Sequence, residues 1–243
     1  LGDILVSTAT PELPSPLLTA SGKLTNAALV MVKITSKCGV EGHSYLFSPN
    51  AKLLPALASA VSVAFEEVKG RSCSPETNTD YLLDKFKLFG GTGILTMAFA
   101  AIDMASWDLL GRALGKPLYR LWGGANTTIP SYESSGLSIG SFGQVLNQAE
   151  TFLRNGNSRM KVRLGYETVD EEVTFLSRLK DELGNNIELT VDYNQGLTFD
   201  QALERYKELD DLDLNWIEAP ILADMLEKAG ELTAKTKTTI QLG

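Results

Sequence analysis

Two hydrophobic patterns divide the chain into a first part, in which strands precede helices, and a second part, in which they alternate. In the first part, alternation of apolar and polar residues predicts short strands, and a period of about 3.6 residues then predicts helices. The expected strands are residues 4–8, 28–35 and 42–47, and the expected helices are residues 52–68, 75–87 and 93–114. Prolines interrupt residues 11–16, and a loop is expected over 17–27. This order indicates an α+β domain, assigned to residues 1–125.

Residues 126–243 repeat a unit of one short strand and one helix. The expected strands are residues 128–134, 159–164, 187–192, 215–218 and 239–242, and the expected helices are residues 142–155, 169–183, 199–209 and 225–236. Such alternation predicts a parallel α/β sheet, either an open doubly wound sheet or part of a (β/α) barrel. Because a barrel needs about eight strands, we expect a truncated barrel domain that continues beyond residue 243.

Composition narrows the classes of function. The 243 residues are 44% hydrophobic, and 22 Lys and Arg face 30 Asp and Glu, for a net charge of −8. An acidic chain without a basic run is not expected to bind nucleic acid or an anionic membrane. No uncharged apolar run reaches the ~18 residues of a membrane span. Two cysteines favour a reducing cytoplasm, and a single histidine argues against a His-rich metal site.

Charged and polar side chains stand at the expected ends of three consecutive strands. Lys161 and Arg163 are two residues apart on one strand, so their side chains face the same side. Asp192 and Asn194 end the next strand, and Glu218 ends the one after it. In a barrel these ends meet at the carboxyl-terminal face, where catalytic groups lie. Two carboxylates without Cys or His suit Mg²⁺ rather than Zn²⁺, and two cations suit an anionic substrate.

Each of these groups, taken alone, also has a structural interpretation. A Lys-x-Arg pair at a strand end is usually a solvated rim. An Asp at a strand end is commonly the cap of the next helix. Glu218 before Ala-Pro is compatible with a loop carboxylate. The combination of one such group on each successive strand end favours a functional site over three unrelated surface positions.

These motifs resemble the enolase superfamily, mandelate racemase subgroup. The resemblance rests on Lys161-Val-Arg163, on Asp192-Tyr-Asn194-Gln195 and on Ile217-Glu218-Ala-Pro220, and in the first half on residues 39–47, 92–97 and 102–108. It covers nearly the whole chain in order. It implies an α+β capping domain over a (β/α)₇β barrel, of which about five strands are present, with Mg²⁺ stabilising an enediolate.

The resemblance also implies roles for the strand-end residues. Asp192 and Glu218 would be two of three Mg²⁺ ligands, and the third would be a Glu that follows Gly243. Lys161 would contact the substrate carboxylate, and Arg163 stands where the family has a lysine base for one enantiomer. Because a guanidinium holds its proton at neutral pH, this departure weakens a two-base reaction.

Further residues would bind the substrate if the resemblance holds. Ser134 would bind its carboxylate and Asn194 its α-hydroxyl. Leu17 and Leu24 would be apolar substrate-facing positions of a flap, which favours an aryl or apolar substrate. The family's other base is a His paired with Asp on later strands, and the single histidine, His43, lies in the capping domain instead.

We therefore expect a Mg²⁺-dependent enzyme that removes the α-proton of a 2-hydroxy carboxylate. Racemisation of the mandelate racemase type is the first reaction, and dehydration of an acid sugar is the alternative, which Arg163 favours. A non-catalytic relative that only binds ligand, and an open α/β protein without metal, are the other classes. The expected partners are a small carboxylate substrate and further copies of the chain in a homo-oligomer, without nucleic acid or membrane.

Overall fold

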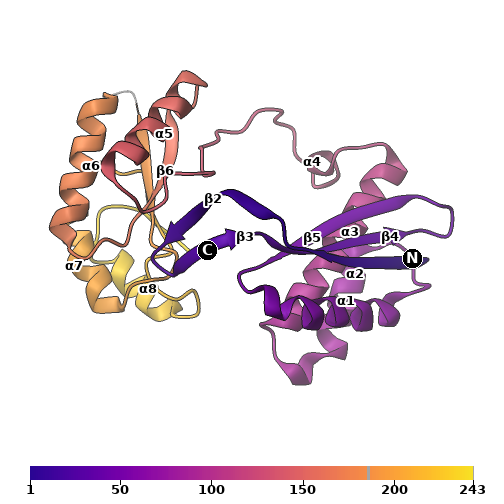
Figure 1. Ribbon diagram of the computed structural model, residues 1–243. Helices are drawn as coiled ribbons and strands as arrows, with labels where there is room; N and C mark the ends of the chain where they lie inside the picture. The colour runs from indigo at the N-terminus through magenta and orange to yellow at the C-terminus, as the bar shows by residue number, and fades with distance from the viewer. Residues whose placement is uncertain (185–186, 243) are drawn as a thin grey trace. The chain divides into compact units, whose positions relative to one another are not determined.

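A computed structural model describes residues 1–184 and 187–242. The chain divides into two compact units (Figure 1): unit 1 comprises Leu1–Pro14 and Asn26–Thr128, and unit 2 comprises Ser15–Thr25 and Ile129–Gly243. The domain limits 1–125 and 126–243 remain a prediction. They differ from the two units chiefly in the segment 15–25, whose contacts place it in unit 2.

Unit 1 is built on a three-stranded antiparallel sheet in the order β1-β4-β5. Its strands are β1 (Asp3–Ala9), β4 (Ala28–Thr35) and β5 (Glu41–Ser48), as the alternating pattern predicted. Along β4 every second side chain is buried, so one face of the sheet lies in the core. Gly42 lets β5 approach a helix, because a Cβ there would lie 2.1 Å from the Ala105 carbonyl oxygen.

The helices of unit 1 cover the buried face of that sheet. They are α1 (Leu54–Val68), α2 (Pro75–Lys85) and α3 (Ile94–Leu114), with the short segments η1 (Ala51–Leu53), η2 (Lys87–Phe89) and α4 (Leu118–Leu121). By length and hydropathy α3 is the one helix of the described residues that resembles a membrane span. Its buried residues, such as Phe99 and Ile102, instead belong to the core shared with α1 and β4. The helix α3 is therefore a central helix of unit 1.

The loop expected over residues 17–27 is wrong. These residues belong to a two-stranded sheet formed by β2 (Glu12–Thr19) and β3 (Gly22–Asn26). Proline cannot donate a ladder hydrogen bond, but a two-stranded sheet leaves each strand one free edge. Pro14 and Pro16 are two residues apart and therefore present the same edge, which leaves the other edge free to pair.

Hydrogen bonds explain why this hairpin belongs with unit 2. The backbone N–H of Ile139 donates to the carbonyl of Leu18 at 3.1 Å. At the tip, the Ser21 hydroxyl donates to the carbonyl of Asn194. The hairpin tip is thereby held against the strand end that carries Asn194.

Unit 2 contains a four-stranded parallel sheet in the order β6-β7-β8-β9. Its strands are β6 (Arg159–Arg163), β7 (Glu188–Asp192), β8 (Ile217–Glu218) and β9 (Ile240–Gln241), each near its predicted position. The helices between and before them are α5 (Phe142–Arg154), α6 (Val169–Leu183), α7 (Phe199–Leu209) and α8 (Leu226–Thr233) (Figure 1). Consecutive helices are neighbours, as repeated βα units require.

Local sequence fixes where two of these helices begin. Thr168 and Thr198 each accept a hydrogen bond from the backbone N–H three residues later, at 3.3 Å. In turn, the side-chain oxygens of Glu171 and Gln201 accept hydrogen bonds from the backbone N–H groups of Thr168 and Thr198. These capping boxes satisfy N–H groups that the helix leaves free, so α6 and α7 start at defined positions after their strands.

The strand expected over residues 128–134 is also wrong in extent. In the described residues only Glu133 makes a bridge to β6, with hydrogen bonds to Arg159 and Lys161. Beyond it the carbonyls of Ser134 and Gly136 accept hydrogen bonds from the Arg163 guanidinium, and the Arg163 backbone N–H donates to the Leu137 carbonyl at 2.9 Å. The first predicted strand is thus reduced to one bridged residue beside β6.

Gly165 and Gly196 make room for Ala20 at the hairpin tip, and Gly196 gives a stability prediction. A methyl group on Gly196 would lie 2.5 Å from the Ala20 Cβ and 3.0 Å from the Tyr193 carbonyl oxygen. Gly196→Ala is therefore expected to lower the free energy of unfolding in urea by about 1–3 kcal/mol. Gly230→Ala on α8, where no atom lies within 4 Å, is the control. It should raise stability by up to ~1 kcal/mol, and equal effects of both variants would contradict the packing argument.

Candidate active site

Three charged side chains from three neighbouring strands meet in unit 2. The parallel register aligns Arg163 with Asp192, and Asp192 with Glu218. The Lys161 Nζ lies 3.0 Å from Asp192 Oδ2 and 2.8 Å from Glu218 Oε1. Lys161 is 6% exposed and Asp192 is 1% exposed, so the contact is largely removed from water. One ammonium group is shared between two carboxylates.

Opposing effects act on the charge of Lys161. Burial favours the neutral amine, but the hydrogen bond to Glu218 and the negative charge of Asp192 outweigh it, and the pKa of Lys161 is raised above its ordinary value. Lys161 therefore stays protonated at neutral pH. Its Nζ also lies 5.9 Å from the centre of the Tyr132 ring, which packs edge-on against Trp216 at 5.1 Å.

Asn194 fixes the orientation of Asp192. Its backbone N–H donates to Asp192 Oδ1 at 2.7 Å, and its side-chain Nδ2 donates to Asp192 Oδ2 at 3.1 Å. This geometry places Asn194 at φ +46°, in the left-handed region that asparagine tolerates better than most residues. Both carboxylate oxygens of Asp192 are thereby held, and the amide oxygen of Asn194 points away from them.

Two oxygen atoms of this cluster are buried without a hydrogen-bond partner among the described residues. They are Glu218 Oε2 and Asn194 Oδ1. A buried acceptor without a partner is costly, and a bound cation is one group that satisfies such an oxygen. The donors are all oxygens, as Mg²⁺ prefers, so the residues fit that ion. Residues 1–184 and 187–242 contain no group of three His, Cys, Asp or Glu side chains that could form a complete set of ligands.

Arg163 lies on the same strand as Lys161 but engages different partners. Its Nη1 donates to the Gly136 carbonyl at 2.6 Å, and its Nη2 lies 3.4 Å from the Ser134 carbonyl. Burial lowers the pKa of Arg163, and the negative charges of Asp192 and Glu218 oppose that shift. The guanidinium thus supports the segment beside β6 while it stays close to the carboxylates.

The remaining expected substrate residues lie in unit 2 as well. Ser134 is half-buried, and its backbone carbonyl accepts a hydrogen bond from the Arg163 guanidinium. Leu17 and Leu24 are half-buried on β2 and β3, the two strands of the hairpin. Their roles in substrate binding remain predictions.

Sequence reasoning missed Tyr132, whose ring faces the Lys161 ammonium. A signal was present, since Tyr132 precedes Ser134 by two residues and so shares its side of an extended chain. The pairing of Tyr132 with Trp216 brings together positions 84 residues apart. That contact depends on the three-dimensional fold and has no local sequence signal.

Two family models match nearly the whole chain. The model "Mandelate racemase / muconate lactonizing enzyme, N-terminal domain" matches residues 3–123. The model "Enolase C-terminal domain-like" matches residues 144–243. Both agree with the order of unit 1 and unit 2 along the chain.

Individual relatives cover the same span. The chain is 28% identical to L-talarate/galactarate dehydratase of Salmonella typhimurium over 237 residues, which are 97% of this chain and 60% of the relative. A Bradyrhizobium enolase solved with magnesium and mandelic acid is 30% identical, with a TM-score of 0.88, over 100% of this chain and 67% of that one. A Streptomyces coelicolor racemase with bound magnesium is 26% identical, with a TM-score of 0.91, over 100% and 68%. The chain thus spans about 60% of the dehydratase and about two thirds of the solved relatives.

Proposed function

The chain belongs to the mandelate racemase / muconate lactonizing enzyme family of the enolase superfamily, and we propose that the protein containing it removes the α-proton of a 2-hydroxy carboxylate. The fold is the family's N-terminal cap followed by part of its barrel. The observation that carries the proposal is the Lys161 ammonium, buried between Asp192 and Glu218 at three strand ends.

This arrangement suits a reaction that builds up negative charge. An α-proton beside a carboxylate is very weakly acidic, so the enediolate left behind needs positive charge close to its oxygens. Mg²⁺, when bound at Asp192 and Glu218, supplies such charge as a Lewis acid. Lys161 supplies a second positive charge from the chain itself. Asn194 keeps Asp192 in place, and its free amide oxygen is available to the ion or to a substrate hydroxyl.

Two complete reactions begin with this step. Racemisation returns the proton to the opposite face, and the apolar Leu17 and Leu24, together with the relative solved with mandelic acid, support an aryl substrate for it. Dehydration of an acid sugar needs one base to start, and two observations favour it as the second candidate. Arg163 is engaged with backbone carbonyls, and a curated relative is a dehydratase.

The wider setting completes the proposal. We propose that the Ser134 hydroxyl binds the substrate carboxylate, with a small carboxylate as the partner molecule. We further propose a cytoplasmic homo-oligomer, in which no nucleic acid or membrane takes part. The acidic net charge of −8 supports the absence of polyanion binding.

Titration calorimetry of the full-length protein with Mg²⁺ tests the metal site. Asp192→Asn removes one ligand charge, and the dissociation constant for Mg²⁺ is expected to rise at least tenfold. Glu188→Gln is the matched control, because Glu188 begins the same strand at its opposite end and pairs with Arg159. Its Mg²⁺ affinity should equal that of the wild type. Equal affinity of the wild type and Asp192→Asn would overturn the assignment.

A further inference from the structure

We propose that Glu172 is a positioning residue for the metal site, acting through the hydroxyl of Tyr193. It holds Tyr193 in place, and Tyr193 stands in the chain between Asp192 and Asn194. This inference rests on the proposed function of Asp192 as a metal ligand. It assigns a role to a buried carboxylate that contacts neither Lys161 nor Glu218.

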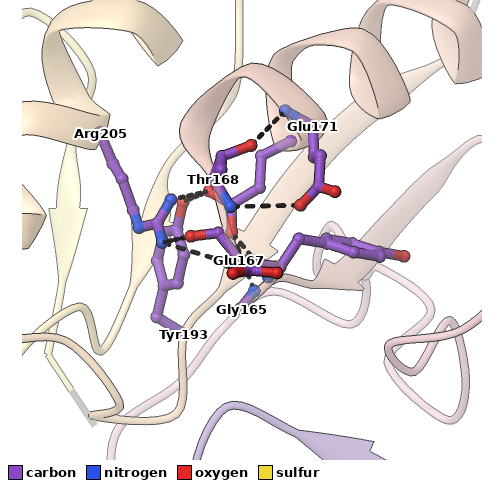
Figure 2. A network of polar contacts seen from close by, with 8 residues as sticks. Gly165, Glu167, Thr168, Glu171, Tyr193 and Arg205 are labelled. Atoms are coloured by element: carbon purple, nitrogen blue, oxygen red, sulfur yellow. Dashed lines mark hydrogen bonds and ion pairs between the residues drawn. The ribbon is translucent and has the colours of Figure 1, made fainter.

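Glu172 lies in the first turn of α6 and is fully buried. Its Oε1 accepts hydrogen bonds from the backbone N–H groups of Gly165 and Tyr166, at 3.0 and 3.1 Å. Its Oε2 accepts from the Tyr193 hydroxyl at 2.5 Å and from Arg205 Nη1 at 3.3 Å. Figure 2 shows Tyr193 and Arg205 reaching toward the segment that holds Gly165. Four donors from three parts of unit 2 converge on one side chain.

Packing of the core would favour an apolar residue over a carboxylate at position 172. The other buried residues of α6 are Phe175, Leu176 and Leu179, and they form part of the apolar core. Replacing a buried ion pair by apolar side chains of similar volume is often neutral or stabilising, so stability is a weak reason for Glu172 and Arg205. The directional contacts of the carboxylate point to a requirement for exact geometry at the groups it holds.

Those groups are the ends of the two strands that carry the site. Gly165 comes two residues after Arg163, at the end of β6, and Tyr193 comes directly after β7. Because side chains alternate along an extended chain, Tyr193 points toward the helices while Asp192 points into the site. The backbone N–H of Tyr193 also donates to the carbonyl of Glu218 at 3.1 Å. The Tyr193 backbone therefore lies between both proposed metal ligands, and its ring is tied to Glu172.

One carboxylate thus links the end of β6 to the end of β7. The 3.0 Å contact between Lys161 and Asp192 spans the same two strands. If the Tyr193 hydroxyl is removed, β6 keeps its two hydrogen bonds to Glu172, and only the end of β7 is released. The expected consequence is a less well placed Asp192 carboxylate, with the fold retained.

The test compares two buried tyrosines, of which one donates a hydrogen bond to Glu172 from its hydroxyl and the other does not. Tyr193→Phe in the full-length protein is expected to raise the Mg²⁺ dissociation constant, measured by titration calorimetry, about tenfold. Tyr206→Phe is the matched control. Tyr206 is fully buried in the same core, but its hydroxyl has no hydrogen-bond partner in the part of the chain that the structure describes. Its loss should leave Mg²⁺ affinity unchanged.

Glu172→Gln provides a second variant that keeps the shape of the side chain and an oxygen for Gly165 and Tyr166. It should weaken Mg²⁺ binding as Tyr193→Phe does, and the double variant should be no weaker than the more affected single one, because both act through one contact. Wild-type affinity in both single variants, with Asp192→Asn impaired, would overturn this inference and leave the proposed function intact. Wild-type affinity in Asp192→Asn would overturn both.

Discussion

Replacing Lys161 by alanine is expected to lower kcat by about two orders of magnitude or more. Its ammonium lies within 3.0 Å of both strand-end carboxylates, in a site from which water is largely excluded. In the proposed reaction a positive charge held there would act on negative charge that develops in the substrate. Removal of the ammonium also leaves Asp192 and Glu218 without their shared cation, so an effect on stability has to be distinguished from an effect on turnover.

The Mg²⁺ affinity of the variant distinguishes a loss of catalysis from a loss of the folded site. Lys161 neutralises the carboxylates that would bind the ion, so the Mg²⁺ affinity of Lys161→Ala should be at least that of the wild type. Lys180→Ala is the matched control, because the Lys180 ammonium donates to the carbonyls of Leu212 and Asp213 in the same unit. Its kcat should remain near the wild-type value. Near-wild-type kcat in Lys161→Ala would exclude the proposed role.

Much of the site was predictable because parallel strands end at the same edge of a sheet. That rule alone brings Lys161, Asp192 and Glu218 together, and the structure places their charged atoms in contact. The predicted bounds of α6 and α7 agree with the structure to the residue, and each helix starts with a capping box. Local signals of this kind do not depend on distant parts of the chain.

The errors fall where distant contacts decide the structure. Pro14 and Pro16 predicted irregular chain, but pairing of β2 with β3 needs only one edge of each strand. Residues 128–134 were expected to form a whole strand, yet among the described residues only Glu133 bridges to β6. In both places the pairing of the backbone with distant strands, rather than the local sequence, decides the structure.

The partners of Glu172 have no local sequence signal either. In the sequence Glu172 is the third acidic residue of a helical first turn, a common and usually exposed position. Its contact with Arg205 spans 33 residues and its contact with Tyr193 spans 21. Helical spacing places Glu172 on the same face of α6 as Phe175 and Leu176, but only the packing of α7 and the end of β7 against α6 supplies its partners.

The second large effect concerns the symmetry of proton transfer. The full-length protein is expected to exchange the α-proton of one enantiomer at least ~10²-fold faster than that of the other, because general-base catalysis contributes about that much and Arg163 does not supply it. The resemblance to the family places Arg163 where a base would stand, and a guanidinium ordinarily keeps its proton at neutral pH.

The contacts of Arg163 favour its protonated form. Burial lowers the pKa of Arg163, but Asp192 and Glu218 act in the opposite direction. The carbonyls of Gly136 and Ser134 accept protons that a neutral guanidine would in part have to give up. We therefore expect Arg163 to position this segment and add positive charge without acting as the base.

Deuterium exchange into each enantiomer of mandelate, followed by NMR, distinguishes the two roles of Arg163. In Arg163→Met the preference for one enantiomer should persist while KM rises, because a positioning cation is lost and no base is lost. Arg159→Met is the control, since Arg159 begins the same strand and pairs with Glu188 instead. Comparable wild-type exchange from both enantiomers, lost for only one of them in Arg163→Met, would identify Arg163 as a true base. Persistent asymmetry would favour dehydration over racemisation, because a racemase must deliver a proton to both faces of the same carbon.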